Sequence, residues 1–159
     1  MKYTRGISFI EVIIASAIIV LIITGVISAY SLWISEHQVS AERVKNAILL
    51  EEGLEAVRSI RDKDWSALAD LSITDTHYLT FSTTTSEWQT TTEPEWIDGV
   101  YKRWFEVDDV SRDNDDRITE SGGSNDPGTK QITVYAAWND RTGTTTTMVS
   151  AYFTNLFEN

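Results

Sequence analysis

A long run without charged residues dominates the start of this chain of 159 residues. No Asp, Glu, Lys or Arg occurs between Glu11 and Glu36, and the intervening 24 residues, Val12–Ser35, are mostly Ile, Val, Leu and Ala. A helix needs about 20 apolar residues to cross the hydrocarbon core of a bilayer. The run is therefore long enough to span a membrane, and it exceeds the roughly 7–15 apolar residues of a cleaved secretory signal.

The residues on either side of this run predict its orientation. Met1–Gly6 contains Lys2 and Arg5 and no acidic residue, whereas acidic residues soon follow Ser35. Positive charge before a membrane helix favours retention of that side in the cytoplasm. We therefore expect a single-pass protein of the inner (cytoplasmic) membrane, with a cytoplasmic N-terminus and a C-terminal domain outside.

A single carboxylate, Glu11, stands at the edge of the apolar run. A charged side chain at the centre of a membrane helix costs about 2.5–3.5 kcal/mol, and less toward the helix end. A plain membrane anchor requires neither this carboxylate nor a glycine at position 6. Glu11 is therefore a candidate functional residue, and a glutamate that merely reaches toward the interface is the simpler alternative.

The residues around Glu11 carry a family resemblance. Gly6–Glu11 reads Gly-Ile-Ser-Phe-Ile-Glu, which resembles the prepilin motif of type IV pilins and type II secretion pseudopilins, commonly Gly followed by Phe-Thr-Leu-Ile-Glu. The motif with its flanks covers about the first third of the chain. In that family a membrane-embedded aspartic peptidase cuts after the glycine and methylates the new N-terminus. The resemblance implies cleavage between Gly6 and Ile7 and methylation of Ile7.

The same resemblance suggests a role for Glu11 in assembly. Cleavage creates a charged amine on Ile7 within lipid, and a neighbouring subunit can place its own Ile7 amine against Glu11. A low dielectric strengthens this attraction and penalises either charge alone. The implied partners are a prepilin peptidase, other pilin or pseudopilin subunits, an inner-membrane assembly platform and membrane lipid.

The helical pattern continues beyond the membrane run. Apolar residues recur close to a period of 3.6, which indicates an amphipathic helix; they are Val39, Val44, Ala47, Ile48, Leu54 and Val57. We predict one helix from about residue 8 to 61, ended by Asp62–Asp64, where Asp64 caps a short turn. The expected divisions are a leader (1–6), a membrane half (7–35), an amphipathic half (36–64) and a globular domain (65–159).

The remaining sequence is typical of strands. Segments rich in Val, Ile, Thr and aromatic residues, three of them with alternating polarity, predict β-strands at Tyr78–Ser82, Val100–Val107, Lys130–Trp138 and Met148–Phe157, with a short edge strand at Ser86–Gln89. Asn139–Gly143 predicts a tight hairpin turn, and Gly122-Gly123 and Asp126-Pro127-Gly128 predict a loop. We expect an α+β fold in which one antiparallel sheet packs on the long N-terminal helix, as in pilins.

Composition excludes several classes of function. Acidic residues outnumber basic ones by 24 to 13, a net charge of −11, whereas direct nucleic-acid binding needs clustered Lys and Arg. Cysteine is absent, so the exported domain contains no disulfide. His37 and His77 are the only histidines and are far apart in sequence, which argues against a zinc site or a Cys-His nucleophile. No catalytic constellation is visible, and we expect a protein that is not an enzyme.

Two other features are weaker candidate sites. Acidic residues crowd one segment as calcium ligands would, at Asp108, Asp109, Asp113, Asp115, Asp116 and Glu120. Their spacing does not fit an EF-hand, so a solvated acidic loop without a cofactor is the preferred interpretation, with calcium at Asp113, Asp115, Asp116 and Glu120 as the alternative. Tryptophans 65, 88, 96, 104 and 138 could form a sugar-stacking platform, but core and sheet packing is the simpler use.

The sequence therefore favours a structural subunit of a filament. Processing by a prepilin peptidase and assembly through the N-terminal helix would place it in a type IV pilus or in the pseudopilus of a type II secretion-like system. The aromatic-rich sheet and the absence of a disulfide loop favour a minor pilin or a pseudopilin. The alternative is a membrane-anchored, extracytoplasmic calcium- or carbohydrate-binding module that does not polymerise.

Overall fold

The computed structural model describes residues 8–140 and 143–156. These described residues form two helices and seven strands in the following order: α1 (Phe9–Lys63), α2 (Ser66–Ala69), β1 (Tyr78–Ser82), β2 (Glu87–Thr91), β3 (Trp96–Ile97), β4 (Tyr101–Arg112), β5 (Ile118–Thr119), β6 (Ser124–Asp140) and β7 (Gly143–Thr154). The chain divides into two compact units, one that ends at Glu42 and one that begins at Arg43.

The first unit contains the apolar part of α1. Its segment Phe9–Ile34 has a mean hydropathy of 2.8, and none of its side chains is buried. Among the described residues this is the one helical segment long and apolar enough to cross a membrane. Hydroxyl groups in the segment bond to the preceding helical turn: Ser16 Oγ donates to Ile13 O at 2.9 Å, and Ser28 Oγ donates to Thr24 O at 2.9 Å. In a bilayer, such bonds would spare the hydroxyls the cost of remaining unpaired.

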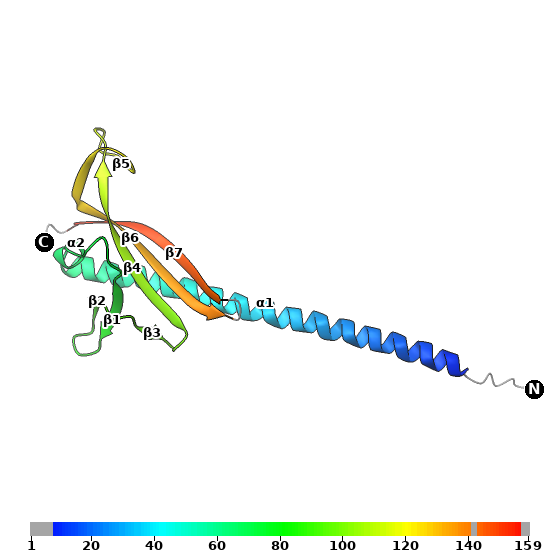
Figure 1. The fold of residues 1–159 in the computed structure, drawn as a ribbon. Coiled ribbons are helices and arrows are strands. Elements are labelled where there is room, and N and C mark those ends of the chain that lie inside the picture. The colour runs from blue at the N-terminus through cyan, green and yellow to red at the C-terminus, as the bar shows by residue number, and fades with distance from the viewer. Residues whose placement is uncertain (1–7, 141–142, 157–159) are drawn as a thin grey trace, which may run out of the picture. The chain divides into compact units, whose positions relative to one another are not determined.

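The second unit is built on an antiparallel sheet of five strands (Figure 1). The main order is β3-β4-β6-β7, and the short β5 pairs with the far end of β4. β4 and β6 are joined from Tyr101↔Trp138 to Arg112↔Ser124, and β6 and β7 from Thr129↔Thr154 to Asp140↔Gly143. The last pair confirms that the segment around Asn139–Gly143 connects two antiparallel strands, although residues 141 and 142 lie outside the described residues.

The expectation of a single sheet is wrong, because β1 and β2 form a separate two-stranded sheet. The hydrogen bonds of β1 are made to β2, and the link to β4 is one isolated bridge, His77↔Phe105. β3 already occupies the same edge of β4 opposite Tyr101 and Lys102. Little of that edge remains for β1, and the α+β class with antiparallel pairing is otherwise as predicted.

The predicted loop at Asp126-Pro127-Gly128 lies within β6 instead. The pairing of β6 with β4 jumps from Lys130↔Asp109 to Asp126↔Val110, which is a register shift of the bulge type. Proline has no N–H group to give to a ladder, so the strand bulges around Pro127 and then resumes pairing. Gly128 N donates to Asp126 Oδ1 at 3.0 Å, which satisfies a backbone group within the bulge.

The end of α1 agrees with the sequence prediction. The helix ends at Lys63, and Asp64 Oδ1 accepts hydrogen bonds from the backbone N and the hydroxyl of Ser66, at 2.9 and 2.6 Å. These bonds lower the pKa of the Asp64 carboxyl, and the bond from the Ser66 hydroxyl has the largest effect. Asp64 thus caps the short α2 helix, although Trp65 is the residue at the N-cap position.

The core of the second unit lies between α1 and the inner face of the sheet. Its buried residues come from the last turns of α1, from alternate positions of β4 and β6, and from the elements beside them: Ala56, Val57, Ile60, Trp65, Leu68, Leu79, Phe105, Val107, Ile132, Val134 and Phe153. A smaller cluster of Leu49, Tyr101, Ala136 and Trp138 continues it. Burial alternates along β4 from Tyr101 to Val107, which places Phe105 and Val107 inside and Trp104 and Glu106 on the opposite face.

The predicted apolar stripe of α1 is confirmed at Val57, which is buried, and at Leu54, which packs against the core. It is wrong at Val44 and Ile48, which are 62% and 53% exposed, because Leu49 and the polar Asn46 are the buried residues of that part of the helix. Asn46 Nδ2 donates to Ala136 O at 3.1 Å and to the hydroxyl of Thr147, whereas Asn46 Oδ1 is buried and has no partner among the described residues. The sheet thus pairs the amide nitrogen alone, and an apolar period cannot reveal such a buried polar residue.

Gly53 is a second contact that hydrophobicity does not reveal. A Cβ atom at this position would lie 2.7 Å from Val134 Cγ1 and 3.1 Å from Arg103 Cδ, so α1 approaches the sheet more closely there than a side chain allows. We expect Gly53→Val to destabilise the second unit by about 1–3 kcal/mol, as overpacked cores do. Thermal unfolding of the full chain in detergent measures this change.

Gly25 of α1 provides the matched control, because a Cβ atom there would meet nothing within 4 Å. Gly25→Val should leave the melting temperature of the second unit unchanged. Equal melting temperatures for Gly53→Val and Gly25→Val would contradict the close approach at Gly53.

Candidate functional site

Glu11 lies in the first turn of α1, on the exposed apolar segment. Its backbone N donates to Ser8 O at 2.9 Å, so the helix begins immediately before it. Among the residues that the structure describes, the Glu11 carboxylate has no ion-pair or hydrogen-bond partner. Gly6 and Ile7, the predicted cleavage and methylation positions, lie outside the described residues.

A shallow hollow lies beside Glu11 on the surface of α1. It has a volume of about 400 Å³ and is lined by Glu11, Val12, Ala15, Ser16 and Ile19. Ala15 and Ser16 are small, and they lie one helical turn beyond the carboxylate on the same side. Small residues allow helices to approach closely within a membrane. The site thus combines an unpaired carboxylate with space for another chain.

A second exposed apolar surface belongs to the second unit. Val44 and Ile48 are one helical turn apart, and the sheet covers neither of them. The buried side of this part of α1 carries Asn46 and Leu49 instead. The helix therefore has apolar side chains both toward its own sheet and toward the solvent.

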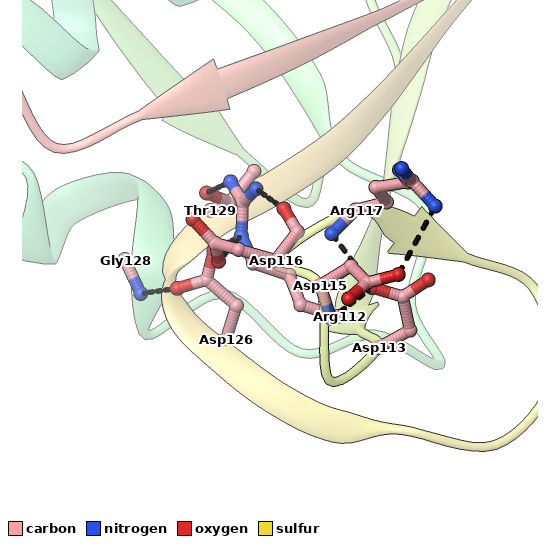
Figure 2. Close-up of polar contacts among 8 residues, drawn as sticks. All are labelled: Arg112, Asp113, Asp115, Asp116, Arg117, Asp126, Gly128 and Thr129. Atoms are coloured by element: carbon pink, nitrogen blue, oxygen red, sulfur yellow. Dashed lines mark hydrogen bonds and ion pairs between the residues drawn. The ribbon is translucent and has the colours of Figure 1, made fainter.

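The acidic segment after β4 is organised by arginines (Figure 2). Asp113 Oδ1 accepts hydrogen bonds from the backbone N of Asp115 and of Arg117, both at 2.9 Å, and thereby closes a tight turn. Asp115 Oδ2 lies 3.2 Å from Arg117 Nη1. Two of the candidate calcium ligands are thus engaged, Asp113 with backbone N–H groups and Asp115 with a guanidinium.

Arg112 makes the largest set of polar contacts in this segment (Figure 2). Its Nε donates to Asp126 Oδ2 at 2.6 Å, its Nη1 to Asp116 O at 2.9 Å and its Nη2 to Thr129 Oγ1 at 3.3 Å. Asp116 Oδ1 is a further 3.7 Å from Nε. Arg112 therefore ties the loop that follows β4 to the bulge of β6.

No group of three metal-ligating side chains gathers anywhere in residues 8–140 and 143–156. Asp113, Asp115 and Asp116 are exposed and differ in their partners, and Glu120 is exposed without joining them. The arrangement explains Asp113, Asp115 and Asp116 as parts of an arginine-bound turn.

The Arg112–Asp126 pair predicts a pH dependence of stability. The hydrogen bond from Arg112 holds the pKa of the Asp126 carboxyl below its ordinary value of 3.8. A carboxyl whose pKa is lower in the folded state stabilises that state fully above pH 3.8 and loses the contribution as the pH falls through the folded pKa. We therefore expect Asp126→Asn to lower the melting temperature at neutral pH and to have much less effect well below pH 3.8.

Thermal unfolding of wild type and variant across this pH range measures the difference. Asp70→Asn is the control, because Asp70 is exposed and has no ion pair among the described residues. A difference between wild type and Asp126→Asn that stays constant from neutral to acidic pH would contradict the role of the ionised pair.

The histidines and tryptophans serve different parts of the molecule. His37 packs edge-on against Trp33, with ring centroids 4.3 Å apart. His77 is buried; its Nε2 lies 2.8 Å from Ser72 O and its ring 5.4 Å from that of Phe105.

Of the five tryptophans considered as a platform, Trp65 and Trp138 are in the core, Trp88 is half-buried on β2, and Trp96 and Trp104 lie on β3 and β4. The five do not form one platform.

Comparison of the chain with protein-family models, with curated proteins and with solved structures gives no match.

Proposed function

We propose that this protein is a structural subunit, a minor pilin or pseudopilin, of a type IV pilus or type II secretion-like filament. The observation that carries the proposal is the Glu11 carboxylate, which has no partner among the described residues and lies on an apolar helix with no buried side chain, beside the small residues Ala15 and Ser16. The sequence Gly6–Glu11 and the basic residues before it resemble a prepilin processing site. Together they favour a helix that assembles with other helices after cleavage at Gly6.

The chemistry of assembly follows from the cost of buried charge. Cleavage between Gly6 and Ile7 would leave an ammonium group on Ile7. The Glu11 carboxylate of a neighbouring subunit could lie at the same depth in the membrane as this ammonium group. The apolar surfaces of the helices gain little from contact with each other in lipid, because lipid is equally apolar. A pair of opposite charges therefore selects one register between the helices.

The second unit offers a further contact for the same assembly. The exposed side chains Val44 and Ile48 lie on α1 beyond the membrane segment, where water makes their exposure unfavourable. A neighbouring subunit packed along α1 would cover them. This surface supports lateral packing, because a solitary membrane-anchored domain gains nothing from it.

The alternative function is a membrane-anchored binding module that does not polymerise. It accounts for the apolar helix, but it leaves Gly6 and the unpaired Glu11 without a role. A hollow on the second unit, lined in part by Trp96, Trp104 and Lys102, favours binding, and a filament subunit can use such a hollow equally well.

Fractionation of cells that contain a type IV pilus or type II secretion assembly system tests the proposal. Filaments are sheared from cells that express the full chain, and the chain is measured in the filament fraction and in the membrane fraction. We expect it in the sheared filaments, and only when the assembly ATPase is active. A chain that stays wholly in the membrane fraction beside working filaments would support the non-polymerising module instead.

A further inference from the structure

A hollow of the second unit lies on the face of the sheet that is turned away from the core. It has a volume of about 470 Å³, within the usual range for ligand sites. Trp96 of β3, Trp104 of β4 and Tyr78 of β1 contribute aromatic walls, and Lys102 and Ala137 lie side by side across β4 and β6. We call this hollow the aromatic groove.

Strand register explains why these residues meet. Trp96 pairs with Lys102, and Lys102 pairs with Ala137 on the next strand, so the three form one row across the sheet. Ala137 is the small member of the row and leaves the space that a larger side chain would fill. The bridge His77↔Phe105 brings the start of β1 to the same edge of β4, which adds Tyr78.

Lys102 is the charged residue of the groove. Its Nζ lies 5.2 Å from the centre of the Tyr78 ring and 6.0 Å from that of Trp104. Within the described residues it forms no ion pair, although the chain as a whole has a net charge of −11. Glu106, on the same face, accepts a hydrogen bond from Tyr135 Oη at 2.9 Å. An unpaired cation among aromatic rings is complementary to a ligand that is anionic and has an apolar face.

The remaining groups at the rim are polar and uncharged. Asn139 and Thr144 line the hollow, and Thr144 Oγ1 donates to Asn139 Oδ1 at 2.7 Å. Trp96 is 54% exposed, so one face of its indole ring is open to a ligand. A pyranose ring has an apolar face of C–H groups and a rim of hydroxyls, and thus matches an aromatic wall with amide and hydroxyl groups around it.

We infer that the aromatic groove binds an acidic saccharide. The sugar ring packs on Trp96, and its carboxylate pairs with Lys102. The inference goes beyond the role as a filament subunit and does not depend on it. Single-stranded nucleic acid also stacks on aromatic side chains, but it needs a basic track along its backbone. The lining of this groove has one cation, Lys102, in a strongly acidic chain, so a uronate fits better than a polyphosphate.

Titration calorimetry tests the inference on the full chain in a detergent without a sugar headgroup. The probe is a trimer of galacturonate, and a neutral trisaccharide of the same size and an oligothymidylate are compared with it. We expect saturable binding of the galacturonate trimer that weakens as salt is raised. Trp96→Ala and Lys102→Met should each weaken this binding about tenfold or more. Lys102→Arg keeps the positive charge and should retain most of the affinity.

Two substitutions outside the groove are controls. Phe81→Ala removes an exposed aromatic ring from β1, and Lys63→Met removes an exposed cation that pairs with Glu87. Both should bind the galacturonate trimer as wild type does, and thermal unfolding verifies that every variant is folded. The inference would be overturned if wild type bound no galacturonate trimer, bound the neutral trisaccharide equally well or preferred the oligothymidylate. It would also be overturned if folded Trp96→Ala kept full affinity for the galacturonate trimer.

Discussion

Replacing Glu11 by alanine is expected to remove the protein from filaments while leaving it in the membrane. Loss of the carboxylate takes a charge away from an apolar helix, so insertion should be unchanged or improved. In the proposed filament the neighbouring Ile7 amine would then lie in lipid without a counter-charge, which is strongly unfavourable. We expect the share of the chain in sheared filaments to fall by about tenfold or more.

Two further variants separate charge from side-chain packing. Glu11→Asp keeps the charge and shortens its reach by one methylene, so its filament share should lie between those of wild type and Glu11→Ala. Ser16→Ala changes a neighbouring residue of the same hollow without affecting charge, and it should assemble normally. Normal filament incorporation of Glu11→Ala would contradict the charge pair as the device that sets register.

Removing the negative charge of Glu52 should destabilise the second unit more than removing the positive charge of its partner, Arg103. The Arg103 side chain is 5% exposed and that of Glu52 is 46% exposed, and their charged groups are 3.0 Å apart. Arg103 Nη1 also donates to Leu49 O at 3.3 Å, whereas its Nε is buried without a partner. Glu52→Gln leaves a buried guanidinium with its counter-charge removed, at a cost of about 1–3 kcal/mol.

Arg103→Met fills the same space without a charge, and the Glu52 that remains can be solvated. The free energy of unfolding of Arg103→Met should fall by no more than about 1 kcal/mol, because an apolar replacement of a buried ion is frequently neutral. Glu55→Gln is the control, since Glu55 forms an exposed pair with Arg58 on the same helix and should change stability by less than about 1 kcal/mol. Chemical denaturation of wild type and the three variants measures their free energies of unfolding. A larger loss of this free energy in Arg103→Met than in Glu52→Gln would contradict the prediction.

The sequence predicts the elements that have strong and regular patterns. The uncharged run and the apolar period beyond it predict α1 to within two residues at each end, because both signals extend over many turns. The strand Tyr78–Ser82 is predicted with the bounds it has, and the start of the strand at Tyr101 within one residue. Glu11 also stands out from the sequence alone, because a lone carboxylate beside an apolar run is conspicuous.

The features that the sequence does not reveal depend on contacts between distant segments. Asn46, Gly53 and Arg103 lie at the contact of α1 with the sheet, although none of them is apolar, because each is accommodated by a particular partner across that contact. The bulge at Pro127 resembles a loop in sequence, and only the pairing on both sides shows that the strand continues. The aromatic groove likewise depends on strand register, which brings Trp96 and Lys102 together.

Membership of a pilus-type filament is tested by the N-terminal mass of the protein recovered from membranes. The full chain is expressed beside an active prepilin peptidase, which must process a known prepilin in the same cells, and the N-terminal peptide is identified by mass spectrometry. We expect a chain that begins at Ile7 with one added methyl group. Gly6→Val should retain Met1, because a branched side chain does not fit the turn required at the scissile bond. Wild-type protein that still begins at Met1 beside the active peptidase would show that the chain is not a prepilin.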